Sequence, residues 1–232
     1  MNNDSPSGAL TQHNLISYID NLSLHDHDNV TDCTRVATRS ADMGHDRYSD
    51  PEVWLHEYLR TFIFLGWKLH QEKLIIKTTS IRNESIAEFL VKNGEKMNDS
   101  RQANAMIDTL DALKFNKPAI LSLDNESHSG RRFQVAPSRY DSEGNLHLAI
   151  FNYELITSFE RDSFLFWSWE ESSAKLIQRS AYLKLDRSVL DTKRQPMEKA
   201  LSKITSDRFI LRKNRLHPPG SHPEPSMFPA PL

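Results

Sequence analysis

The fold of this 232-residue chain is decided by one stretch, residues 50–69, which reads DPEVWLHEYLRTFIFLGWKL. Asp50 ahead of Pro51 and Glu52 is typical of a helix start, because it supplies an N-cap, a proline in the first turn and an acid near the positive end of the helix dipole. Apolar residues then cover most of the helix circumference, and such a helix is normally buried. We therefore predict that the central helix of the core begins at Asp50 and ends between residues 70 and 73.

Two further helices are predicted after a short strand with β-branched character at residues 74–79. The first covers residues 80–93 and ends before Gly94, because glycine is favoured just past a helix end. The second is capped by Asp99 or Ser100, its apolar side chains recur at helical spacing from Ala103 to Leu113, and Pro118 is expected to end it.

After Pro118 the apolar pattern changes to a period of two residues, which favours strands. The predicted strands cover residues 119–123, 131–136, 145–153, 164–169 and 174–185. The turn signal DSEG at residues 141–144 joins the second and third of these strands as a hairpin. A capped helical segment follows Asp186 in two pieces around Pro196, and residues 209–211 are expected to form an edge strand.

These elements predict an α+β fold with N-terminal helices, an antiparallel β-sheet and a C-terminal helical segment packed on it. Strands and crossover helices do not alternate over most of the chain, which argues against a doubly wound parallel sheet. Three parts are expected: a flexible acidic arm at residues 1–49, a single α+β domain at 50–213, and a proline-rich disordered tail at 214–232. Within the arm, residues 15–22 have the spacing of a short helix.

Composition narrows the classes of partner. The formal net charge is −2, so no overall field attracts nucleic acid, and we expect no nucleic-acid partner. The longest apolar stretch, residues 58–69, is too short and too charged to span a bilayer. No signal peptide is visible and Cys33 is the single cysteine, so we expect a cytoplasmic protein without disulfides, with non-classical export left open.

Common catalytic signatures are absent from the sequence. No two of its seven glycines lie within five residues of each other, which excludes the glycine-rich loops that hold phosphates. A single cysteine excludes thiolate zinc clusters and CxxC redox pairs. Arg60 stands where an HExxH zinc motif beginning at His56 needs its second histidine. We therefore predict no cofactor.

The densest group of metal-ligating side chains lies in the predicted arm and consists of His25, His27, Asp28 and His45. Metal ligands need surrounding groups that hold their geometry, and a flexible segment does not supply them. A solvated polar segment is the simpler interpretation. We therefore expect no metal site, and these four residues are its weak candidates.

Two pairs of residues are candidates for binding. Trp167 and Trp169 share one face of the predicted strand 164–169, and aromatic residues are enriched in protein interfaces, although core packing is the commoner role at alternating strand positions. Arg131 and Arg132 follow a polar loop and could clamp a phosphate or carboxylate. Alternatively, the two arginines decorate a solvent-exposed edge of the sheet.

Two functions from different classes follow. The missing signatures and the biased ends favour a non-enzymatic interaction or assembly protein that binds another protein or itself. The alternative is a hydrolase, possibly metal-assisted, whose site combines distant carboxylates and histidines. The histidines of the predicted domain are His56, His70, His128 and His147. A third hypothesis, a subunit of a larger assembly or toxin system, has no specific residue in its favour.

Overall fold

The computed structural model describes residues 8–19, 22–70, 75–96, 100–158, 163–168, 174–203 and 209–211, and for 94–96, 100–105 and 209–211 it describes the backbone only. Within these ranges the chain forms seven helices and eight strands. The helices are α1 (Leu24–Gly44), α2 (Pro51–Phe64), α3 (Ile86–Lys96), α4 (Ser100–Lys114), α5 (Lys117–Ser127), α6 (Arg187–Thr192) and α7 (Arg194–Leu201). The strands are β1 (Gly8–Thr11), β2 (Asn14–Tyr18), β3 (Trp67–Leu69), β4 (Ile75–Ile81), β5 (Phe133–Tyr140), β6 (Leu146–Ile156), β7 (Ala174–Leu185) and β8 (Phe209–Leu211).

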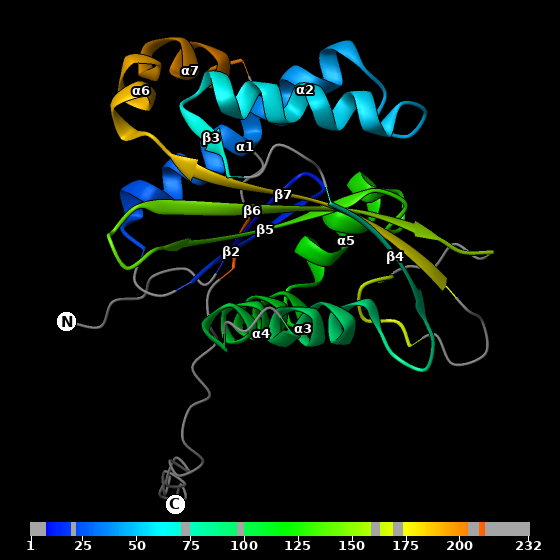
Figure 1. The fold of residues 1–232 in the computed structure, drawn as a ribbon. Helices are drawn as coiled ribbons and strands as arrows, with labels where there is room; N and C mark the ends of the chain where they lie inside the picture. Colours follow the sequence, from blue (N-terminus) through cyan, green and yellow to red (C-terminus); the bar gives the residue numbers. More distant parts are fainter. Residues whose placement is uncertain are drawn as a thin grey trace, which may run out of the picture.

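The strands form one sheet in the order β3-β7-β6-β5-β2-β1-β8, and β4 pairs with the same edge of β7 as β3 does. Neighbouring strands are antiparallel except β2 and β5, which are parallel. Figure 1 shows the sheet between two layers of helices, with α1, α2, α6 and α7 in the upper layer and α3 and α4 in the lower layer. The predicted α+β class is confirmed.

Each face of the sheet has its own apolar core. The upper core lies under α1 and α2 and contains Trp54, Tyr58 and Phe62, which are 1% exposed or less. The lower core lies against α3, α4 and α5, and its fully buried aromatic residues include Phe133 and Phe164. A sheet covered on both faces buries consecutive residues of its central strands, which is why β2 and its neighbours carry little alternation of apolar and polar residues.

The central helix is α2, and its predicted start is confirmed, since it begins at Pro51. It ends at Phe64, earlier than predicted. Gly66 has a φ of +96°, and a Cβ atom there would lie 2.9 Å from the carbonyl oxygen of Asp186. This turn stops the helix and redirects the chain into β3, which pairs with β7.

The expectation of a flexible arm at residues 1–49 is wrong for the part that the structure describes. β1 and β2 lie inside the sheet, and α1 packs in the upper core through Val30, Cys33 and Ala37. Of the predicted helix 15–22, residues 15–18 belong to strand β2, because Leu15 enters the lower core while Ile16 enters the upper core. The low apolar content misled the prediction, since α1 buries polar side chains such as Thr31 and Thr38, whose hydroxyls form hydrogen bonds.

Two predicted strands are also wrong. Residues 119–123 belong to α5, because Pro118 lies in its first turn and the Asn116 side chain accepts a hydrogen bond from the Ala119 backbone N–H at 3.2 Å. Residues 163–166 form turns, and Ser168 makes an isolated bridge with Ser85. The hairpin of β5 and β6, the two helical pieces after Asp186 and the edge strand β8 are confirmed. The predicted tail at 214–232 lies outside the described residues.

Candidate functional site

The apolar circumference of α2 exceeds what the upper core covers. Trp54, Tyr58 and Phe62 face the sheet, whereas Ile63 and Phe64 are 47% and 56% exposed. An apolar helix face that no other element covers marks a surface for a ligand or partner more often than a scattered single residue does. At the C-terminal end of α2, apolar side chains therefore remain exposed to solvent beyond the part of the helix that the core covers.

Ile63 and Phe64 line a groove between α1, α2 and α7, which we call the helix groove. Its volume is about 670 Å³, which is within the range of sites that bind ligands or partner side chains. Val36, Leu65 and Met197 form its floor. Met43 on α1, which is 77% exposed, also lines the groove.

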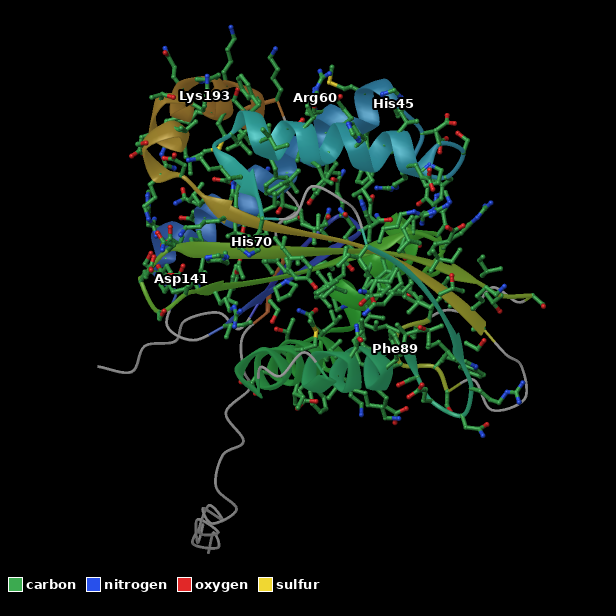
Figure 2. All side chains as sticks on the ribbon, viewed as in Figure 1. His45, Arg60, His70, Phe89, Asp141 and Lys193 are labelled. Carbon is green, nitrogen blue, oxygen red and sulfur yellow. The ribbon has the colours of Figure 1, made fainter. Side chains whose placement is uncertain are left out.

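The charged residues around the helix groove are mainly cations. Arg39, Arg60 and Lys203 line it, and the single acid is Glu57, which pairs with Arg60 at 3.3 Å. Lys193 adds a fourth cation, since its Nζ lies 4.6 Å from the centre of the Phe64 ring. Figure 2 shows Arg60 and Lys193 on the outer surface of the upper layer.

A network of ion pairs and hydrogen bonds ties α1, one wall of the groove, to α6 and β5. Arg187, at the start of α6, donates to both carboxylate oxygens of Asp26 on α1, at 2.6 and 2.8 Å. Tyr140 donates to the same carboxylate, and the Asn29 side chain donates to it at 3.0 Å. Burial alone would raise the pKa of Asp26, but these hydrogen bonds outweigh it and hold the pKa well below its ordinary value of 3.8.

Two further contacts join α7 to α1. Arg194 donates from Nη1 to the side-chain oxygen of Asn29 at 2.7 Å, and Arg39 donates to the backbone carbonyl of Lys203 at 3.1 Å. The α1–α2 side is fixed by Trp54, whose indole N–H donates to Asp42 at 2.7 Å. The groove is therefore built on elements that are tied to one another, which suits a preformed binding surface.

Arg131 and Arg132, the arginine pair predicted as a binding candidate, lie in different environments. Arg131 is exposed, and its guanidinium lies 5.9 Å from the centre of the Tyr48 ring. Arg132 is 6% exposed, and its Nη1 donates to Glu154 at 2.6 Å, where Arg179 also bonds at 3.3 Å. Burial lowers the pKa of Arg132, while the Glu154 charge raises it in part. Because this carboxylate already occupies Arg132, the pair does not form a shared clamp in the structure.

The aromatic candidates lie away from the helix groove. Trp167 is 44% exposed in a segment of turns, on the lower side of the sheet with Phe164 and Leu165. Trp169 lies outside the described residues. The predicted shared strand face is not present, because Phe164 and its neighbours do not form a strand.

The weak metal candidates do not meet. His27 is buried and stacks on Tyr18 with ring centres 4.0 Å apart, while His25 contacts Arg194 at 3.0 Å. Asp28 lies on the same first turns of α1, and His45 follows the opposite end of that helix. Among the described residues no group of three or more His, Cys, Asp and Glu side chains has the geometry to hold a metal ion.

The histidines of the hydrolase alternative lie apart in the described part of the chain. His147 bonds Asp141 at 2.9 Å beside the β5–β6 turn, and His128 stacks on Tyr48 with ring centres 4.2 Å apart. His56 and His70 are exposed, on α2 and after β3. A buried histidine, His13, accepts a hydrogen bond at Nδ1 from the Arg47 guanidinium, and burial and the Arg47 charge lower its pKa well below 6.5. The hydrolase alternative stays a prediction.

Sequence reasoning did not single out the helix groove. One signal was available, since α2 carries apolar residues on more of its circumference than one covered face requires. The other walls could not be found, because Val36, Arg39 and Met43 lie in the segment predicted to be a flexible arm.

Within the described residues, no helix is both long and apolar enough to cross a bilayer.

Comparisons with known proteins find only distant structural similarities. No protein-family model matches the sequence, and no curated protein matches it. A solved structure described as a delta-endotoxin has a TM-score of 0.45 and 10% identity, covering 76% of this chain and 84% of that one. The Evf virulence factor has a TM-score of 0.44 and 10% identity, covering 84% of each chain. Activated Cyt2Ba from Bacillus thuringiensis subsp. israelensis has a TM-score of 0.43 and 9% identity, covering 76% of this chain and 99% of that one. Similarities of this size carry no inference about function.

Proposed function

We propose that the protein is a non-enzymatic interaction protein that binds an acidic, amphipathic helix of a partner protein in the helix groove. The observation that carries the proposal is the combination of exposed apolar side chains, above all Phe64, with a rim on which cations outnumber acids. An amphipathic helix that enters a groove between helices uses its apolar face as the anchor. Acidic residues beside that face would meet the cationic rim.

The apolar part of the groove supplies most of the expected affinity. Burying a large apolar side chain contributes about 1.5–3 kcal/mol relative to leaving it in water. Ile63 and Phe64 are each about half exposed, and Met43 is more exposed, so all three have surface left to bury. Part of this gain is offset by ordering the partner and its side chains.

The charges of the rim select the partner. Arg60 is 75% exposed at its side chain even though it pairs with Glu57, and Lys203 is exposed at the end of α7. A basic helix would meet like charges at Arg39, Arg60 and Lys203, whereas an acidic helix would pair with them. Complementary charges of this kind favour the correct partner and its approach more than they add affinity.

The test uses two synthetic amphipathic helices with one apolar face of leucines. The acidic peptide carries glutamates beside that face, and its twin carries lysines at the same positions. We expect the acidic peptide to bind, as measured by isothermal titration calorimetry, at least about tenfold more tightly than the lysine twin. Equal binding of the two peptides, or no binding of either, would overturn the proposal.

A matched pair of variants locates the binding. Phe64→Ser removes the exposed aromatic ring of the groove, and we expect it to weaken binding of the acidic peptide about tenfold. Leu121→Ser removes a side chain on α5 that is 57% exposed and distant from the groove, so binding should not change. If both variants bind the peptide as the wild-type protein does, the helix groove is not the site.

A further inference from the structure

The edge strand β4 is the second surface on which apolar side chains remain in water. Its residues read IIKTTSI, and all but Thr79 and Ile81 are exposed. Ile75 is 37% exposed and Ile76 57% exposed. β4 pairs with β7 through all seven of its residues, and among the described residues no strand pairs with its other edge.

An open edge of this kind is unusual in a protein that stays a monomer. Unpaired N–H and C=O groups form a template for another strand, and natural edges are normally shortened, bulged, or protected by proline or several charges. β4 has seven residues, no proline and no glycine, and Lys77 is its single charge. Five of the seven residues are isoleucine or threonine, whose β-branched side chains favour strands.

We infer that β4 pairs with β4 of a second copy of this chain, in an antiparallel arrangement about a two-fold axis at Thr78. Thr78 is the middle residue of the seven, and Ile75 and Ile81 lie three positions on either side of it. In this register Ile75 faces Ile81 of the other copy, and Lys77 faces Thr79. No lysine faces a lysine, and threonine faces threonine at the axis, which is a favourable cross-strand pair.

Pairing in this register also covers apolar surface. Ile81 is fully buried and belongs to the lower core, whereas Ile75 is exposed on the same face of β4. Directly opposed residues on antiparallel strands have Cβ atoms about 4.5–5.5 Å apart. Ile75 of one copy would therefore lie beside Ile81 of the other and extend the lower core of each.

A two-fold pairing of this kind closes on itself. Each copy uses the same strand, so the contact is isologous and yields a dimer instead of an open filament. The helix groove lies on the upper layer, on α1, α2 and α7, and takes no part in this contact. The dimer is thus independent of the proposed partner helix, and either proposal can fail without the other.

The first test is disulfide cross-linking of the full chain carrying Thr78→Cys. Two cysteines at the axis would have Cα atoms about 4.5–5.5 Å apart, which is within the usual range for a disulfide. The native Cys33 is buried and does not compete. We expect oxidation to give a covalent dimer, while the control Thr192→Cys, at an exposed position of α6, stays a monomer. Equal cross-linking of both variants would overturn the inference.

The second test measures mass in solution by light scattering coupled to size-exclusion chromatography. The wild-type protein should have twice the 26.8 kDa mass of the chain at high micromolar concentration. Thr78→Lys and Thr78→Glu should each be monomeric, because like charges would oppose each other at the axis, and a mixture of the two variants should restore the dimer. Thr192→Lys is the matched control and should remain dimeric. A monomeric wild-type protein, or a dimer that Thr78→Lys leaves unchanged, would contradict the inference.

Discussion

The helix groove and the β4 edge both expose large apolar side chains, yet they suit different partners. The groove is concave and its rim is cationic, so it is complementary to an acidic helix and not to itself. β4 is extended, carries one charge, and has isoleucines three positions on either side of Thr78, so an antiparallel pair of copies brings isoleucine against isoleucine without opposing like charges. Exposed apolar surface indicates that something binds, whereas shape and charge determine what binds.

The largest expected effect comes from removing Asp26, which should weaken binding in the helix groove without affecting β4. Asp26→Ala removes the carboxylate that Arg187, Tyr140 and Asn29 bind at the junction of α1 and α6. The Arg187 side chain is 44% exposed, so water can solvate its charge once Asp26 is removed. Hydrogen bonds to a charged group contribute about 1.5–3 kcal/mol, and we expect a loss of that size in the free energy of unfolding, measured with urea. Below the unfolding transition, acidic-peptide binding should fall while cross-linking through Thr78→Cys persists.

The control for this change is Asp191→Ala. Asp191 pairs with Arg194 at 3.3 Å but is 66% exposed at its side chain. Exposed pairs contribute about 0–1 kcal/mol. If Asp191→Ala and Asp26→Ala destabilise the protein equally, the Asp26 network does not frame the groove.

Acid should weaken the hydrogen bonds and ion pair of Asp26 before it weakens the β4 pairing. The pKa of Asp26 is held below its value in the unfolded chain, so its contribution is present above the unfolded pKa of about 3.9 and is lost as pH falls toward the folded pKa. We expect the free energy of unfolding to decrease below about pH 4, and by less in Asp26→Asn. Equal acid dependence of the wild-type protein and Asp26→Asn would contradict this role of Asp26.

Single surface variants should separate the two functions with moderate effects. Phe64→Ser should weaken acidic-peptide binding about tenfold and leave the dimer intact, while Thr78→Lys should abolish the dimer and leave peptide affinity unchanged. The measurements are calorimetry for the peptide and light scattering for the dimer. A variant that changes both readings would show that the surfaces are coupled.

Salt should have the smallest effect and should again distinguish the surfaces. Raising the salt concentration from about 0.1 M to about 1 M shortens the Debye length from ~10 Å to ~3 Å and screens exposed charges such as Arg60 and Lys203. Affinity for the acidic peptide should fall several-fold, whereas the β4 dimer, with no ion pair in its register, should keep its mass. A salt-sensitive dimer with salt-insensitive peptide binding would reverse the assignment.

Much of the fold followed from local signals in the sequence. Asp50-Pro51 marks the start of α2, the Asp141–Gly144 turn marks the β5–β6 hairpin, and Asp186 caps α6 through the Val189 backbone N–H at 3.4 Å. Each of these signals lies within a few residues of the structure that it predicts. Tertiary contacts only had to agree with them.

The errors lie where distant contacts decide. The segment 8–44 looks polar, but Tyr18 bonds Thr31 at 2.6 Å and Asn14 bonds Thr38 at 3.2 Å, so these polar groups are paired across α1 and β2. Such pairs become favourable only after the elements meet. The residues 119–123 alternate like a strand, yet Asn116 and Pro118 start a helix there.

Contacts between distant residues also explain why the candidate site could not be predicted from the sequence. Arg132 was found as a polar residue, but its bond to Glu154 ties the segment before β5 to β6 and is invisible in sequence. The helix groove combines residues from α1, α2 and α7 that are more than a hundred positions apart in the chain, such as Val36 and Met197. Their sequence patterns are those of ordinary helix faces.

Hydrogen–deuterium exchange measured by mass spectrometry, with and without the acidic amphipathic peptide, tests the central claim most directly. If the helix groove is the binding site, peptide addition should slow exchange in α2 around Ile63 and Phe64, in the facing turns of α1, and in α7, with β4 unchanged. Protection confined to β4, or spread over the protein without a maximum at these three helices, would contradict it.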